Sequence, residues 1–310
     1  MDRVYYADNL DVLRSLPSDS IPLIYIDPPF NTGRERVRTA LRTVRAADGD
    51  RTGFLGRRYA TTVLGTERYA DAFDDYAAFL EPRLREAHRV LAPDGTLYFH
   101  GDYREIHYCK VQLDGIFGRA CFLNEIVWAY DYGGRTKKRW PPKHDTILVY
   151  VKDPLRYVFN ADDVDREPYM APGLVGPEKA ARGKLPSDVW WRTIVSPTGK
   201  EKTGYPTQKP LGVLRRIVRA SSRPGDVVLD FFAGSGTTGA AARELGRRFI
   251  LVDNNEAALR VMARRFATYP DVDFIGFDPA TGASPVIDNS LPLPELGEGG
   301  GAARQRGGGG

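Results

Sequence analysis

The 310-residue sequence contains only two cysteines, Cys109 and Cys121. They do not form a Cys-x-x-Cys pair, so neither a disulfide framework nor a structural zinc site is expected. Two small buried thiols are the favoured interpretation, and a cysteine nucleophile is the weaker alternative. We therefore expect no metal ion in the chemistry of this protein.

Long apolar runs are also missing. No stretch approaches the roughly 18–20 residues that cross a bilayer, and the first residues do not resemble a signal peptide. We therefore expect a cytoplasmic, nucleoid-associated protein with no membrane partner. The hydrophobic and charged fractions, 42% and 27%, are ordinary for a globular protein, and the length suits one large domain or one domain with an insertion.

Acidic residues are scarce in two segments, although the net charge of the whole chain is only +4. Between Arg34 and Arg58 eight arginines accompany three acidic residues, and the segment 135–143 holds five basic residues and no acidic one. Local clusters of this kind on a nearly neutral chain favour a polyanionic partner. Solvated loops explain each cluster equally well when it is considered alone.

The order of the apolar segments predicts an α/β fold. Residues 21–26 form a short, β-branched-rich run that ends at Asp27, which is typical of a buried parallel strand. Helices on both faces of a sheet are expected from the alternation of strands with helices. The other expected strands are 4–6, 96–100, 125–130, 145–151, 227–229 and 249–252, and the expected helices are 10–16, 74–91, 106–117, 207–218, 237–245 and 256–268.

Some segments break this alternation. Residues 31–70 are rich in Arg, Thr and Gly, which predicts a long mobile loop with a short helix around 37–44. From 152 to about 205 the content of Pro, Gly and charge rises, which predicts an inserted subdomain. Within the helix expected at 74–91, Pro82 must cause a kink or begin a second helix.

The segment from Asp230 to Thr237 places Gly234 and Gly236 between an expected strand and an expected helix. It lacks the full Gly-x-Gly-x-x-Gly of a dinucleotide site and the Gly-Lys-Ser/Thr ending of a phosphate loop. It better suits S-adenosylmethionine, whose carboxylate would meet amides at the helix start while Asp230 meets its ammonium. Asp253, at the end of the next strand, suits the ribose hydroxyls. The alternative is a structural turn with an ordinary strand-end aspartate.

The tetrad Asp27-Pro28-Pro29-Phe30 ends a different strand. Ligands in open α/β sheets bind at strand carboxyl ends, so both loops should border one crevice. Adenine N6 and cytosine N4 are poor nucleophiles, because their lone pair is delocalised into the ring. The stiff turn offers the Asp27 carboxylate and the Pro28 carbonyl as two acceptors for the amino protons, and Phe30 as a face for a flipped base. The alternative, a Pro-Pro turn after a strand, is the weaker interpretation beside the glycine loop.

Four segments together resemble the amino-group DNA methyltransferases of restriction–modification systems, in their permuted β order, over roughly residues 1–270. The resemblance implies a Rossmann-like S-adenosylmethionine-dependent methyltransferase fold. Its sheet would be twisted, mixed and mostly parallel, with seven strands, one of them antiparallel, and with an inserted target-recognition region. The four segments are Tyr6-Ala7-Asp8-Asn9-Leu10, Asp27-Pro28-Pro29-Phe30-Asn31-Thr32-Gly33, Pro206-Thr207-Gln208-Lys209-Pro210 and Asp230 to Thr238.

The resemblance also implies the cofactor, S-adenosyl-L-methionine, and the residues that hold it. Asp8 and Asn9 would bind its adenosine, and Thr207, Gln208 and Lys209 would line its methionine end. The main cofactor loop would consist of Phe232, Ala233, Gly234, Ser235, Gly236, Thr237 and Thr238.

The same resemblance divides the chain. The catalytic half would occupy 1–130, including the basic loop 34–70, and the target-recognition insert 131–205, beginning with a strand-rich basic segment. The cofactor half would occupy 206–280, and 281–310 would be a disordered Gly-rich tail.

Double-stranded DNA is the expected partner, with the arginine-rich segment 34–58 closing over it. Homodimers are common in this group, and a cognate restriction endonuclease is a further partner that such systems imply. Trp140, Trp190 and Trp191 would pack or stack, core packing being the more common role. The residues expected to contact phosphates are Arg34, Arg36, Arg135, Lys137, Lys138, Arg139 and Lys143.

The predicted reaction is direct transfer of a methyl group to adenine N6 in duplex DNA by base flipping, with no covalent intermediate. Asp27 at the head of the tetrad favours adenine over cytosine N4, where serine is common, and Phe30 stands where tyrosine is more usual. Three alternatives remain: a cytosine-N4 enzyme, a non-catalytic DNA-binding relative, and a methyltransferase acting on RNA, protein or a small molecule. A dinucleotide oxidoreductase is least favoured, because it leaves the tetrad unexplained.

Overall fold

A computed structural model describes residues 2–31, 34–46, 48, 50–52, 58–71, 73–131, 136–196 and 199–283. Arg135 and residues 284–310 of the expected tail lie outside the described residues. Among the described helices, none is long and apolar enough to span a membrane.

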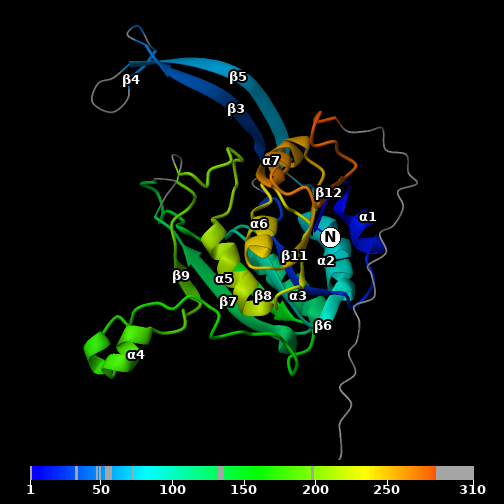
Figure 1. The fold of residues 1–310 in the computed structure, drawn as a ribbon, viewed down its shortest axis with the longest axis vertical. Helices are drawn as coiled ribbons and strands as arrows, with labels where there is room; N and C mark the ends of the chain where they lie inside the picture. Colours follow the sequence, from blue (N-terminus) through cyan, green and yellow to red (C-terminus); the bar gives the residue numbers. More distant parts are fainter. Residues whose placement is uncertain are drawn as a thin grey trace, which may run out of the picture.

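The described residues form a main sheet of nine strands, in the order β12-β1-β11-β10-β2-β6-β8-β7-β9 (Figure 1). Neighbouring strands are parallel except at β8, which runs antiparallel to both β6 and β7. The strand bounds are β1 Asp2–Tyr6, β2 Ile21–Ile26, β6 Leu91–Gly101, β7 Phe122–Ala129, β8 His144–Val151, β9 Val189–Trp191, β10 Val227–Asp230, β11 Arg248–Asp253 and β12 Val272–Ile275.

The mixed, mostly parallel sheet with one antiparallel strand is thus confirmed, but it has nine strands rather than seven. The two additional strands, β9 and β12, contain three and four residues. Segments this short are below the length at which an alternating apolar pattern is distinguishable from a loop.

Helices cover both faces of the sheet, as the alternating pattern predicts. One face packs against α1 (Asn9–Ser15), α2 (Tyr76–Val90) and α3 (Ile106–Phe117), and the other against α5 (Leu211–Ser221), α6 (Thr237–Glu244) and α7 (Glu256–Phe266). Strand β2 lies at the centre and is buried on both sides, since Ile24 belongs to the first core and Leu23 to the second. Helix α2 continues through Pro82 as one element, so Pro82 does not begin a second helix.

The mobile loop and short helix expected at 31–70 are wrong. The backbone forms a β-hairpin of β3 (Arg34–Arg45) and β5 (Arg58–Asp71), paired antiparallel from Arg34 and Asp71 onwards, with the short strand β4 (Arg51–Thr52) beside β5. Figure 1 shows this hairpin projecting away from the main sheet. Its sequence interleaves arginines with Val and Thr, which have high β propensity, and that signal should have outweighed the overall polarity.

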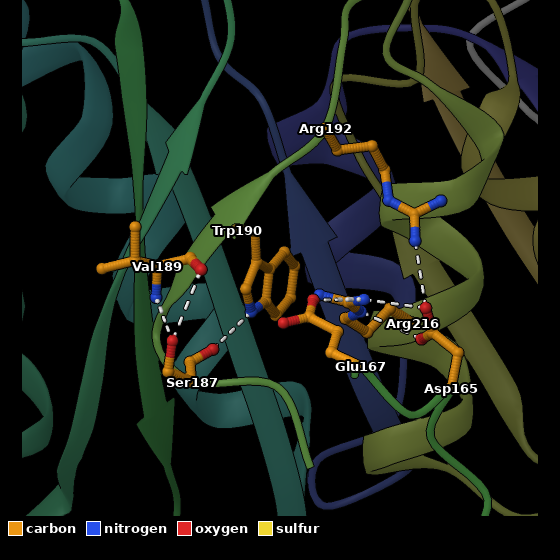
Figure 2. Close-up of polar contacts among 7 residues, drawn as sticks. All are labelled: Asp165, Glu167, Ser187, Val189, Trp190, Arg192 and Arg216. Atoms are coloured by element: carbon orange, nitrogen blue, oxygen red, sulfur yellow. Dashed lines mark hydrogen bonds and ion pairs between the residues drawn. The ribbon is translucent and has the colours of Figure 1, made fainter. Parts of the chain in front are cut away.

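The segment after β8 is joined to the body by a partly buried ionic cluster (Figure 2). Arg216 on α5 is 4% exposed and pairs with Asp165 at 2.7 Å and Glu167 at 3.0 Å, and its guanidinium lies 5.0 Å from the ring centre of Trp190. Arg192 reaches Asp165 from the other side at 3.0 Å. The same segment carries the single-turn helix η3 (Pro172–Leu174) and the short helix α4 (Pro177–Arg182).

Candidate active site

Four parallel strands, β1, β11, β10 and β2, lie side by side, and their carboxyl ends meet at one edge of the sheet. Asp27, Asp230 and Asp253 stand at or directly after three of these ends, and Asp8 follows the fourth. All four residues line a single cavity of about 340 Å³. The two loops singled out in the sequence, some 200 residues apart, therefore border one site, as expected.

The glycine loop turns sharply between β10 and α6. Gly234 and Gly236 adopt φ angles of +51° and +70°, in the left-handed region that favours glycine. A Cβ on Gly236 would lie 2.8 Å from Met262 Cγ, so this glycine serves the packing of the loop on α7. The loop residues that line the cavity are Phe232, Ala233, Gly234, Ser235, Thr237 and Thr238.

Asp230 is a buried carboxylate at the base of this loop. It accepts hydrogen bonds from Thr238 Oγ1 at 2.6 Å and from the backbone N–H of Phe232 at 3.0 Å. Burial raises the pKa of Asp230 to about 7, because these hydrogen bonds only partly offset the loss of water and the neighbouring Asp27 and Asp253 add negative charge. A cationic ligand would stabilise the ionised carboxylate.

Asp253 connects the end of β11 to the glycine loop. Its two oxygens accept backbone N–H groups of Gly234 at 2.8 Å and Asn255 at 2.9 Å, and enclosure by protein raises its pKa to about 6. Asp253 thus fixes the loop as well as lining the cavity. Each carboxylate oxygen keeps a further lone pair, which leaves acceptor capacity for ligand hydroxyls.

Arg83 of α2 organises the opposite wall, and sequence reasoning missed it. Its guanidinium pairs with Asp8 at 3.2 Å, donates to Asn9 Oδ1 at 2.6 Å and lies 4.1 Å from the ring centre of Phe79. Asn9 in turn donates to the carbonyl oxygen of Phe231 at 2.8 Å. Asp8 and Asn9 line the cavity as expected, but an arginine some 75 residues away holds them there.

The Pro-Thr-Gln-Lys-Pro segment contributes two of its three expected residues to the cavity. Thr207 and Lys209 line it, whereas Gln208 is absent from the lining. Gln208 accepts from Thr203 N at 2.8 Å and donates to Glu201 O at 2.7 Å, so it braces the preceding loop. Lys209 forms an ion pair with Asp27 Oδ2 at 2.6 Å.

The tetrad turn is held from outside by α2. Tyr76 donates its hydroxyl proton to the Pro29 carbonyl at 2.6 Å, and Asn31, in the left-handed region at φ +48°, accepts from Phe73 N at 3.0 Å. Inside the turn, Asp27 Oδ1 is buried and has no hydrogen-bond partner. An unpaired carboxylate oxygen facing a cavity is costly for the free protein and is an acceptor for a ligand N–H.

The expected DNA-contact residues have different surroundings. Arg34 and Arg36 lie on strand β3, where only the backbone is described, and Lys143 is partly exposed. Lys137, Lys138 and Arg139 are exposed, next to Trp140, which is 94% exposed.

The other tryptophans divide. Trp191 is 76% exposed, whereas Trp190 is 7% exposed and packs against Arg216, which confirms core packing for Trp190 alone. Both cysteines are buried and free, as expected, and burial raises the pKa of the Cys109 thiol to about 12.

The site suits a ligand that is cationic at one end. Two buried carboxylates, Asp230 and Asp27, face the cavity, and a Cβ on Gly234 would lie 3.1 Å from Tyr205 Cε1, so glycine keeps this approach open. A glycine loop and a strand-end aspartate on adjacent strands, together with one antiparallel strand beyond β6, define a Rossmann-like S-adenosylmethionine-dependent methyltransferase.

Comparison with known proteins narrows this class to a family. The model of the DNA methylase family, which comprises N6 and N4 methyltransferases, matches residues 21–264. The chain belongs to this family: it is an S-adenosyl-L-methionine-dependent DNA methyltransferase.

Two relatives and one solved structure illustrate the similarity. The chain is 32% identical to the DNA adenine methyltransferase YhdJ of Escherichia coli (strain K12) over 270 residues, 84% of this chain and 81% of the relative. It is 32% identical to the type II methyltransferase M.HpaI of Haemophilus parainfluenzae over 276 residues, 89% and 76% of the two chains. The DNA modification methylase TTHA0409 of Thermus thermophilus, complexed with S-adenosyl-L-methionine, shares the fold with a TM-score of 0.54, 23% identity and coverage of 89% and 100%.

Proposed function

We propose that this DNA methyltransferase methylates adenine N6, and that the buried Asp27 Oδ1 accepts one proton of the target amino group. The observation that carries this proposal is the missing hydrogen-bond partner of Asp27 Oδ1 in a cavity shared with the glycine loop. The aspartate at the head of the tetrad and the similarity to YhdJ, named an adenine methyltransferase, favour adenine.

The roles of the protein groups follow from the chemistry of an amino nitrogen. S-adenosyl-L-methionine supplies a methyl group on a sulfonium, a leaving group that needs no acid. Asp27 Oδ1 and the Pro28 carbonyl accept the amino protons, which favours a nitrogen lone pair directed out of the ring plane. Phe30 stacks against the extruded base, and burial of the site excludes water from the reacting atoms.

The cofactor contacts are part of the proposal. Asp230 balances the charge of the methionine ammonium, and Asp253 receives the ribose hydroxyls through its remaining lone pairs. Asp8 and Asn9 bind the adenosine end, held in place by Arg83. The glycine loop and Thr207 enclose the methionine end.

The direct test is nucleoside mass spectrometry after the purified chain has been incubated with DNA of varied sequence and labelled cofactor. N6-methyladenine supports the proposal, and N4-methylcytosine replaces adenine by cytosine with the same site. If wild type binds the cofactor but modifies no base, the non-catalytic alternative is correct. Transfer to RNA or protein with none to DNA would reject the substrate class.

We further propose that the exposed segment 136–143 and the hairpin β3–β5 bind the DNA backbone. Each phosphate contact that is lost should reduce the slope of log affinity against log salt by about 0.9. Replacing Lys137 and Lys138 by alanine should therefore weaken binding to all sequences and flatten that slope. Arg85→Ala on exposed α2 is the control, and an equal slope in both variants would reject the contact.

A further inference from the structure

A chain of buried polar side chains runs across four neighbouring strands beside the tetrad. Tyr25 lies on β2, His100 on β6, Asp145 on β8, and Tyr130 directly follows β7. The Tyr25 hydroxyl and His100 Nδ1 are 2.7 Å apart, His100 Nε2 and Asp145 Oδ2 are 3.2 Å apart, and Tyr130 donates to Asp145 Oδ1 at 2.9 Å. These four residues are called the Tyr–His–Asp chain below.

The chain touches the active site at one end. Tyr25 lines the same cavity as Asp27, two residues further along β2. His100 is fully buried, and its ring centre lies 6.2 Å from that of Phe30. At the other end Tyr130 is partly exposed. The chain therefore connects the reaction cavity to the sheet interior behind the stacking ring.

The hydrogen-bond partners determine the direction of the chain. Burial acts to raise the pKa of Asp145, but hydrogen bonds and charge from His100, with Lys209 and Tyr130, outweigh burial and leave the pKa below its ordinary value. An ionised Asp145 only accepts, so a neutral His100 carries its proton on Nε2. Nδ1 then accepts from Tyr25, and the lone pairs of the Tyr25 oxygen are left for other donors.

The reaction needs a proton acceptor besides Asp27. When the methyl group has moved to the amino nitrogen and the sulfur has kept the bonding electrons, the nitrogen carries one proton too many. Protonating Asp27 would break its 2.6 Å ion pair with Lys209 inside a nearly buried site, leaving the ammonium unpaired. A neutral acceptor with a base behind it avoids that cost.

We propose that Tyr25, backed by His100 and Asp145, accepts the proton that leaves the methylated amino group, a role that rests on the proposed function. The N–H bonding electrons return to nitrogen as the proton moves to the Tyr25 oxygen. The original Tyr25 proton moves to His100 Nδ1, and the resulting imidazolium pairs with Asp145. After the product leaves, the proton returns by the same path to water in the cavity. The logic is that of a nucleophile–histidine–aspartate triad, with an amine proton as its substrate.

The chain offers a matched control. Tyr98 of β6 is the register partner of Tyr25, is equally buried, and loses an equivalent bond, 2.7 Å to Ser221 Oγ, when its hydroxyl is removed. Tyr25→Phe should lower the rate of DNA methylation at saturating cofactor and DNA by about 10²-fold, the range of general base catalysis. Tyr98→Phe should stay within about threefold of wild type, and both should bind the cofactor like wild type.

A second experiment separates proton transfer from packing. His100→Gly should lose a similar factor, and added imidazole should restore much of it, since imidazole accepts at one nitrogen and donates at the other. N-methylimidazole fills the same space but cannot do both, so it should not rescue. Equal rescue by the two, or equal rates of Tyr25→Phe and Tyr98→Phe, would overturn the relay while leaving the methyltransferase proposal intact. A wild type that binds cofactor and methylates nothing would remove the proposed function itself.

Discussion

The ammonium of Lys209 lies 2.6 Å from Asp27 Oδ2 and 4.8 Å from the ring centre of Phe30. A cation thus lies between the proposed acceptor and the proposed stacking face. In this position Lys209 holds one carboxylate oxygen and leaves the other directed at the substrate. The resemblance assigned this lysine to the cofactor, whereas the geometry connects it to the tetrad.

Lys209→Met should therefore impair transfer more than cofactor binding. Removing one partner of a buried ion pair leaves an uncompensated charge, a loss of about 3–5 kcal/mol in other proteins. We expect methyl transfer to fall at least about tenfold and the melting temperature to drop, with the cofactor Kd changed much less. Lys202→Met, at an exposed lysine of the same loop, is the control. Wild-type turnover by Lys209→Met would show that the ion pair is dispensable.

Cofactor affinity should depend on pH. In the free protein the pKa of Asp230 is raised to about 7 and that of Asp253 to about 6, so both are partly protonated below neutrality. A ligand cation favours the ionised forms, so binding releases protons and weakens by up to about tenfold per pH unit and group as the pH falls through these values. Titration calorimetry between pH 5.5 and 8, in buffers of different ionisation enthalpy, measures both effects. Asp230→Asn should flatten the upper part of the profile, and an unchanged profile would contradict the role of Asp230.

Sequence patterns located the two loops and the central strands because those signals are local. The run 21–26, the tetrad and the glycine loop each lie within a few residues, and sheet geometry then places their ends together. Arg83, His100 and Asp145 carry no local signal, since their partners lie between 45 and 75 residues away. The hairpin β3–β5 was missed for a different reason: its arginines suggested a solvated loop, and pairing between Arg34 and Asp71 is invisible in a short window.

The ionic cluster around Arg216 should be structural rather than catalytic. Arg216→Met leaves Asp165 and Glu167 without their buried partner, and we expect a loss of about 2–3 kcal/mol in the free energy of unfolding, since both carboxylates are about one-third exposed. Burial acts to raise the pKa of Asp165, but Arg216 outweighs burial and lowers it, so this stabilisation is present at neutral pH and is lost as the pH falls through the lowered pKa.

The neighbouring Arg215 is the matched control for this prediction. It forms an exposed pair with Glu244, and Arg215→Met should cost less than about 1 kcal/mol. Chemical denaturation of both variants at pH 7 and at pH 3.5 gives the comparison. Equal losses at pH 7 would mean that the cluster does not anchor the segment after β8.

The most direct test of the role of Asp27 is the single-turnover rate of methyl transfer by Asp27→Asn. Lys209 has only donors, so it should hold the amide oxygen and turn the amide NH₂ towards the substrate, where Asp27 Oδ1 now lies. A donor would then face the donors of the target amino group. We predict a loss of at least about 10²–10³-fold, as when other preorganised polar groups are removed from active sites, with the cofactor Kd within a few-fold of wild type. A rate within tenfold of wild type would contradict the proposal that this oxygen accepts the amino proton.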